Sequence, residues 1–123
     1  MTYLDAVDIL FTKLPMFQRS GPAAYKPNLD GTKAVCTLLG NPENDLKFIH
    51  VAGTNGKGTV SHMVAGVLQE AGYKTGLFTS PHLVDFRERI RINGEKIPES
   101  KVVNFVKTYM YSWGKPSFFE LTF

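Results

Sequence analysis

The sequence predicts an α/β fold with a phosphate-binding loop, a mostly parallel sheet, flanking helices and a short β-hairpin. A β-branched and aromatic run at 47–52 leads into a glycine-rich loop and then into apolar residues at helical spacing. A second apolar run at 75–79 completes a βαβ unit, whose two strands should be parallel. Asn93-Gly94 separates two further short runs and is a strong hairpin signal, because both turn positions need positive φ.

Helices are expected on both sides of this unit. Thr2 can cap a first helix, whose apolar residues recur at helical spacing until Pro15 ends it. The segment 15–31 holds three prolines and two glycines and is predicted to be a loop. A second helix is expected at about 32–39, with a stop at Gly40, Asn41 and Pro42.

The rest of the chain alternates helices with short extended segments. Glycine and proline mark the boundaries between them. In chain order, we expect a helix that ends before Gly72, an irregular loop at 80–88, hairpin strands at 89–92 and 96–97, a helix at 100–113 and a new element in 117–123.

Length and composition fit one modest globular domain. The 123 residues are 43% hydrophobic and 20% charged, which is too apolar for a disordered chain. The net charge of +3 arises from 14 basic and 11 acidic residues that form no long run of one sign. The basic residues cluster only at Arg87, Arg89 and Arg91, so we expect no nucleic-acid partner.

The N-terminal residues and the single cysteine indicate the cytoplasm. Charged side chains at Asp5, Asp8, Lys13 and Arg19 rule out a signal-peptide core, and no apolar stretch approaches the roughly 20 residues of a membrane span. Cys36 is alone, which favours a reducing compartment. We therefore expect a cytoplasmic protein without a membrane partner, in which Cys36 is a small buried residue rather than a reactive thiol.

An ATP-phosphate-binding loop is predicted at Gly53-Thr54-Asn55-Gly56-Lys57-Gly58-Thr59. The glycines let backbone amides turn towards phosphate oxygens, and the following helix adds its positive end. Lys57 places a charge on the β- and γ-phosphates, and the Thr59 hydroxyl can face Mg²⁺. The alternative is a glycine-rich connector that binds nothing, which the lysine, the hydroxyl and the flanking strand and helix disfavour. Because the spacing departs from GxxxxGK[ST], a kinase-like phosphotransferase is also disfavoured.

The chain carries five motifs in order: LGNP at 39–42, HVAGTNGKGT at 50–59, GLFTSPHL at 76–83, FRERIRING at 86–94 and FFE at 118–120. This pattern resembles the Mur ligase superfamily in its folate branch, the folylpolyglutamate synthases and dihydrofolate synthases. In the cell-wall ligases of the superfamily, a nucleotide-sugar domain precedes the ATP loop. Only 52 residues precede it here, which favours the folate branch.

The resemblance implies a Mur-ligase-type central ATPase domain and an ATP-dependent amide ligation. A substrate carboxylate would take the γ-phosphate to become an acyl phosphate, and the amine of L-glutamate would then displace phosphate. The acceptor would be dihydropteroate, a folate, or both. Lys57 would be the catalytic residue, because its charge together with Mg²⁺ offsets charge on the transferring phosphoryl group.

The resemblance also implies metal ligands and substrate neighbours. In the family, the serine of the TSP motif and the glutamate of the FFE motif bind magnesium, which corresponds to Ser80 and Glu120, both with oxygen donors suited to a hard cation. Without the family, Ser80 is a turn hydroxyl and Glu120 a helix-start carboxylate. The loop after Ser80 is similar to the family's loop beside the folate or pteroate. It makes substrate neighbours of four residues: Pro81, His82, Phe86 and Arg87.

Chemistry alone gives these loop residues two interpretations. Phe86 could stack on a flat ligand and Arg87 could meet a carboxylate, whereas an exposed basic loop residue is more often only solvated. His82 has no second metal-binding side chain at ligand spacing, so we do not expect it to bind a metal by itself.

Family members continue far beyond the FFE motif. We therefore expect residues 1–123 to be the N-terminal part of the ATP-binding domain, with the rest of that domain and the C-terminal domain absent. The alternative is a stand-alone nucleotide-binding or interaction module without catalysis. We expect the parent to be a monomer. The isolated chain should self-associate through apolar residues that lose their partners, namely Phe118, Phe119, Leu121 and Phe123.

We predict that the isolated chain does not synthesise glutamyl amides. Ligation requires ATP and two substrates in one geometry, and positioning can supply roughly 7 to 11 kcal/mol of the barrier. The measurement is a multiple-turnover assay of the purified 123-residue chain with dihydropteroate and folate acceptors. Many turnovers of product would contradict the prediction.

Overall fold

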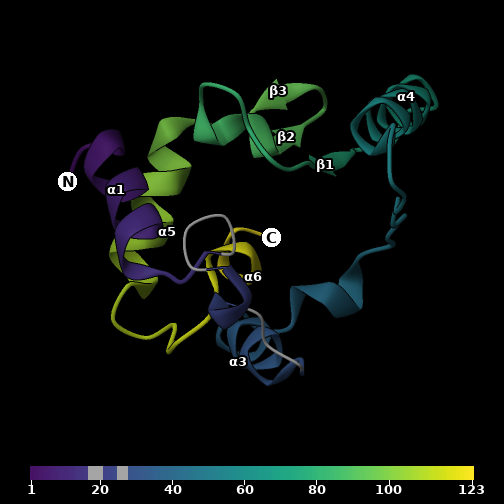
Figure 1. Cartoon of the computed structure of the whole chain (residues 1–123). Coiled ribbons are helices and arrows are strands. Elements are labelled where there is room, and N and C mark those ends of the chain that lie inside the picture. The colour runs from purple at the N-terminus through teal and green to yellow at the C-terminus, as the bar shows by residue number, and fades with distance from the viewer. Residues whose placement is uncertain (17–20, 25–27) are drawn as a thin grey trace. The chain divides into compact units, whose positions relative to one another are not determined.

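The computed structural model describes residues 1–16, 21–24 and 28–123 (Figure 1). The chain divides into two compact units. The helical unit comprises Met1–Lys47 and Ser100–Phe123, and the sheet unit comprises Phe48–Glu99. Part of the loop predicted at 15–31, including Arg19, lies outside the described residues.

Helix α1 spans Tyr3–Lys13 and begins with a capping box, as predicted from Thr2. The Thr2 hydroxyl accepts a hydrogen bond from the Asp5 amide at 3.2 Å, and the Asp5 carboxylate accepts one from the Thr2 amide at 2.7 Å. The same bonds lower the pKa of Asp5. Ala6 and Leu10 are the buried residues of the helix, so a local cap and one apolar stripe determine its position.

The described part of the helical unit contains three further α-helices: α3 at Asp30–Leu38, α5 at Glu99–Tyr109, whose first residue belongs to the sheet unit, and α6 at Phe118–Thr122. Two short 3-10 helices, η1 at Gly21–Ala24 and η2 at Pro42–Asp45, belong to the same unit. The predicted stop after α3 is confirmed, because Asn41 adopts φ 54° and its amide bonds to the Cys36 carbonyl at 2.7 Å. Cys36 is half-buried, and burial raises the pKa of its thiol, which fits a packing role. None of the helices in the described part of the chain combines the length and apolar content of a bilayer-crossing segment.

The C-terminal residues join the core of the helical unit. The Phe11 and Phe118 ring centroids are 4.8 Å apart, and the Phe118 amide bonds to the Pro15 carbonyl at 2.9 Å. The expectation that Phe118 and Leu121 lose their partners is therefore wrong, since they are only 3% and 6% exposed. Their i, i+3 spacing on α6 turns both side chains inwards. Phe119 and Phe123 do remain exposed.

The sheet unit contains one α-helix, the 3-10 helix η3 at Phe86–Arg89 and a small sheet. Helix α4 spans Lys57–Glu70 and is followed by Gly72 at φ 91°, as the predicted stop requires. The strands are β1 at Gly76–Phe78, β2 at Ile90–Ile92 and β3 at Glu95–Lys96, in the order β1-β2-β3. Both pairings are antiparallel. The α/β class is confirmed.

The predicted parallel βαβ pair is not found among the described residues. Residues 47–52 form no strand, and Phe48 and Ile49 are 58% and 64% exposed. A strand exists only through hydrogen bonds to a neighbour, and β1 pairs instead with β2, which returns antiparallel to it. The sequence run has strand propensity, but it belongs to no strand of the described sheet.

The hairpin between β2 and β3 is confirmed. Arg91 pairs with Lys96 and Ile92 with Glu95, so Asn93 and Gly94 form a two-residue turn. Their φ angles are 49° and 82°, as a type I′ turn requires. The Asn93 amide bonds to the Thr75 carbonyl, and its side-chain oxygen accepts from the Thr75 amide, both at 2.9 Å. The turn therefore also holds the chain that enters β1.

Asn93→Ala should destabilise the chain more than Asn93→Gly. Both substitutions leave the amide of buried Thr75 without its acceptor, at a cost of about 1–3 kcal/mol. Alanine adds the strain of positive φ, roughly 1–2 kcal/mol. Urea unfolding measures both, with Asn104→Ala on the exposed face of α5 as the control. Equal losses in the two Asn93 variants would contradict the strain argument.

Candidate functional site

The predicted phosphate loop leads directly into α4. Gly56 adopts φ 79° at the N-cap position, a left-handed conformation that favours glycine, and Lys57 is the first helical residue. Glycine offers no side-chain oxygen, so no side chain caps the first turn. Residues 52–60 are exposed. The helix thus presents its first amides and the positive end of its dipole at an exposed loop, the arrangement that binds phosphate in many proteins.

The Lys57 side chain folds back over its own loop. Its ammonium donates to the Gly53 carbonyl at 2.6 Å and lies 3.5 Å from the Thr54 carbonyl. The next turn carries another local hydrogen bond, because the Ser61 hydroxyl donates to the Lys57 carbonyl at 2.7 Å. Local contacts therefore place the Lys57 ammonium among the loop residues. A bound phosphate group could replace the carbonyls as the partner of this ammonium.

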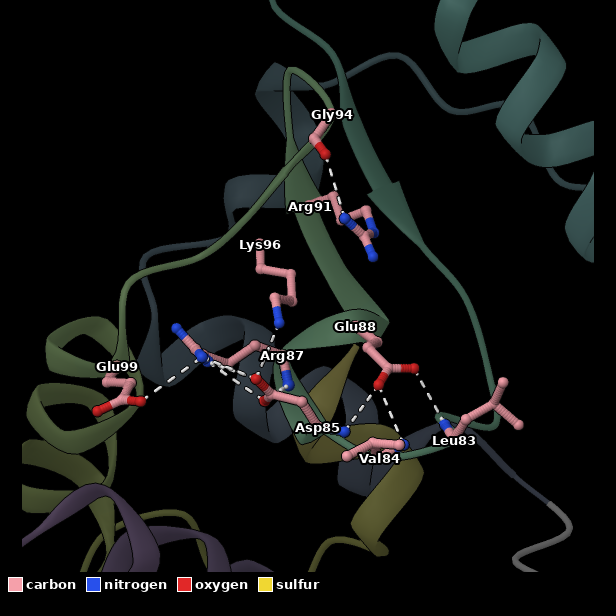
Figure 2. Close-up of polar contacts among 9 residues, drawn as sticks. All are labelled: Leu83, Val84, Asp85, Arg87, Glu88, Arg91, Gly94, Lys96 and Glu99. Atoms are coloured by element: carbon pink, nitrogen blue, oxygen red, sulfur yellow. Dashed lines mark hydrogen bonds and ion pairs between the residues drawn. The ribbon is translucent and has the colours of Figure 1, made fainter.

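The loop at 80–88 is organised by Glu88, a residue that the sequence patterns did not single out. Its carboxylate accepts from the amides of Leu83 at 3.0 Å, Val84 at 3.0 Å and Asp85 at 2.7 Å (Figure 2). These backbone hydrogen bonds, led by that of Asp85, lower the pKa of Glu88 to about 2. In the sequence, the spacing of Asp85 and Glu88 is that of a capping box, and this pattern could have indicated the role of Glu88.

Arg87, a predicted substrate neighbour, is engaged in ion pairs within the sheet unit. Its guanidinium contacts the Asp85 carboxylate at 2.7 Å and lies 3.5 Å from that of Glu99. Lys96 approaches the same Asp85 oxygen at 3.1 Å (Figure 2). The partly exposed network joins the loop to the hairpin and to the start of α5, so Arg87 has a supporting role in this structure.

His82 lies against a buried arginine. Arg89 is 4% exposed and its Nε donates to His82 Nδ1 at 2.7 Å. Because Nδ1 accepts, the imidazole carries its proton on Nε2. Burial, and next the charge of Arg89, lower the pKa of His82. Arg89 was seen in the sequence only as a member of a basic cluster, and its place in the core comes from the tertiary structure.

Phe86 occupies a different position from the one expected. Its ring is 4% exposed and meets the His82 ring edge-on, with centroids 6.1 Å apart. A buried ring offers no open face for stacking on a flat ligand in this structure, and the role of Phe86 as a substrate neighbour stays a prediction. The buried ring anchors the loop, while Ser80 and Pro81 at its start are exposed.

The proposed magnesium ligands offer only oxygen donors. Thr59 and Ser80 lie in the sheet unit, and Glu120 lies in the helical unit on α6. Glu120 forms a capping box with Ser117, as the helix-start interpretation requires. Within the described residues, no three His, Cys, Asp or Glu side chains gather as a metal site. Hydroxyl and carboxylate oxygens suit Mg²⁺, which often takes few protein ligands beside phosphates and water.

Acid should weaken the contribution of Glu88 to stability. Since its pKa is about 2 when folded and 4.5 in an unperturbed glutamate, the contribution is complete above pH 4.5 and is lost as the pH falls towards 2. Unfolding free energies across this window should therefore fall less in Glu88→Gln than in the parent chain. Glu95→Gln, an exposed position on β3, is the control and should keep the parent's pH dependence. An unchanged slope in Glu88→Gln would refute the assignment.

Comparisons with known proteins agree on one group. No protein-family model matches the chain. A probable bifunctional folylpolyglutamate synthase/dihydropteroate synthase of Haloferax volcanii is 42% identical over 106 residues, which cover 86% of this chain and 12% of that protein. A dihydrofolate synthase/folylpolyglutamate synthase of Bacillus subtilis is 40% identical over 104 residues, which cover 78% of this chain and 24% of that protein. The chain thus spans less than a quarter of the length of either relative.

Solved structures extend the similarity to the fold. The folylpolyglutamate synthase of Thermotoga maritima matches with a TM-score of 0.80 and 38% identity over 97% of this chain and 28% of that one. An FPGS complex with AMPPCP and folate matches with a TM-score of 0.72 and 31% identity over 98% of this chain and 30% of that one. Escherichia coli FolC in complex with DHPP and ADP matches with a TM-score of 0.74 and 29% identity over 99% of this chain and 28% of that one. Over most of its length, this chain is homologous to the folylpolyglutamate and dihydrofolate synthases.

Proposed function

We propose that this chain supplies the ATP-binding part of an ATP-dependent amide ligase that adds L-glutamate to dihydropteroate or to folates. The observation that carries the proposal is the exposed loop Gly53–Thr59 at the start of α4, in a chain homologous to folylpolyglutamate synthases. Complexes of the structural relatives with AMPPCP and folate, and with ADP and DHPP, support a nucleotide and a pterin-type acceptor as ligands.

The chemistry requires an activated carboxylate. An amine does not displace oxide from a carboxylate at neutral pH, so the acceptor carboxylate first takes the γ-phosphoryl group of ATP and releases ADP. The glutamate amine then attacks the acyl phosphate, forms the amide bond, and releases phosphate and a proton. The first amides of α4 bind phosphate oxygens, and the Lys57 ammonium stabilises charge on the transferring group.

Magnesium is part of the proposal. The residues that would hold it are Thr59, Ser80 and Glu120, all with oxygen donors. When bound, the ion neutralises charge on the phosphates. The carboxylate of Glu120 is held by hydrogen bonds from Ser117 and Thr32, so this donor is already oriented.

The loop after Ser80 is proposed to border the acceptor. Pro81 is exposed and His82 is partly exposed, and Glu88 and Arg89 hold this segment in place. Such support keeps a binding loop in one geometry before the ligand arrives. Arg87 contributes through its contacts with Asp85 and Glu99.

We propose that the ligation reaction is carried out by a protein longer than these 123 residues. The curated relatives are at least four times the length of the matched region, and the structural relatives are between three and four times that length. We therefore propose that residues 1–123 are the N-terminal part of the ATP-binding domain, in a monomeric cytoplasmic ligase whose further parts complete the acceptor and glutamate sites.

Lys57→Ala in the full-length protein should reduce ligation far more than tenfold while the fold remains. The substitution removes the charge that we propose faces the phosphates, together with the bond to the Gly53 carbonyl, and alanine suits the first turn of a helix. Steady-state glutamate incorporation measures the effect, and circular dichroism monitors the fold. Lys74→Ala is the matched control, because Lys74 is also an exposed lysine of the sheet unit. A loss within tenfold, only ~1.4 kcal/mol of barrier, would refute the role of Lys57.

A further inference from the structure

The Glu120 carboxylate is held on both of its oxygens. The Ser117 amide donates to Oε2 at 2.7 Å, and the Thr32 hydroxyl donates to Oε1 at 3.0 Å. Ser117 is local, whereas Thr32 lies on α3, 88 residues away along the chain. Both contacts are partly buried. The carboxylate therefore links the first turns of two helices in the helical unit.

The backbone of α3 approaches this carboxylate closely. A Cβ on Gly31 would lie 3.2 Å from Glu120 Oε1, which is tighter than an ordinary van der Waals contact. Gly31 has no Cβ, so the carboxylate can rest against the start of the helix. A larger residue at this position would push Oε1 away from the Thr32 hydroxyl. The close contact of Gly31 with the carboxylate and the hydrogen bond from Thr32 therefore depend on the same position of Glu120.

The two hydrogen bonds restrict rotation of the carboxylate. Each carboxylate oxygen has two acceptor positions, and the Ser117 amide and the Thr32 hydroxyl occupy one position on each oxygen. A hydrogen bond to an ionised carboxylate is stronger than one between neutral groups. The Thr32 bond therefore selects one orientation of the group in advance of any ligand.

We propose that Thr32 is a positioning residue that orients the Glu120 carboxylate for a divalent cation. The inference rests on the proposed function, which makes Glu120 a magnesium ligand. Outer hydrogen bonds of this kind fix the direction of a ligand's lone pairs, and their loss typically lowers metal affinity roughly 10- to 100-fold. A purely structural role of Thr32 would instead affect stability alone.

The test uses the full-length protein with Thr32→Val, which is nearly isosteric but removes the donor. Thr32→Ser retains a hydroxyl and should rescue the effect. Thr37→Val is the matched control, because Thr37 lies on the same helix with a local hydrogen bond from its hydroxyl to the Lys33 carbonyl at 2.9 Å. Two readouts are needed: urea unfolding of Thr32→Val, Glu120→Gln and the double variant, and the Mg²⁺ concentration for half-maximal AMPPCP binding.

The proposal expects non-additive stability losses in the double variant and a Mg²⁺ requirement raised roughly 10- to 100-fold in Thr32→Val but not in Thr32→Ser or Thr37→Val. Additive losses would overturn the contact itself. Non-additive losses with an unchanged Mg²⁺ requirement in Thr32→Val would overturn the positioning role. If Glu120→Gln also leaves the Mg²⁺ requirement unchanged, the magnesium role of Glu120 in the proposed function fails, and the positioning role fails with it.

Discussion

A carboxylate that accepts backbone amides at the start of its own helix is the interaction that recurs most clearly in the described structure. It occurs at Asp5 on α1, at Glu88 on the 3-10 helix η3 before β2 and at Glu120 on α6. In each case the acid replaces the missing acceptor of a first turn and adds a favourable charge at the positive end of the helix. At Glu88 the same bonds gather three consecutive amides, so they determine the whole loop rather than one turn.

Local features of the fold could be predicted from the sequence because their causes are local. The cap at Thr2, the turn at Asn93-Gly94 and the start of α4 after Gly56 each depend on residues a few positions apart. The arrangement of the strands could not be predicted in the same way, because strand pairing depends on which segment lies beside each strand in the folded chain. In the structure, β2 follows β1 after the connection at 79–89 and pairs with it antiparallel, and 47–52 belongs to no strand of the described sheet.

The candidate site divides in the same way. The place of the loop Gly53–Thr59 directly before α4 was predicted, since spacing and composition carry that signal, and its binding of phosphate stays a prediction. The roles of Arg87 and Phe86 were not, because an ion pair with Glu99 and burial of a ring are decided by chain segments brought together on folding. The partnership of Thr32 with Glu120 joins residues 88 positions apart, and no local pattern in the sequence points to it.

The N-terminal end of α4, where we propose that phosphate binds, owes its geometry to local bonds more than to packing. Ala65 is the only residue of the helix that is fully buried in the described structure, and Met63 and Val67 are 67% and 70% exposed. Most protein helices gain their stability from a packed apolar face, which α4 largely lacks in the described residues. Its first turn is instead defined by the left-handed Gly56 and by the bond from Lys57 to the Gly53 carbonyl. A loop ordered in this way can present its amides and its cation to a phosphate even where little of the helix behind it is buried.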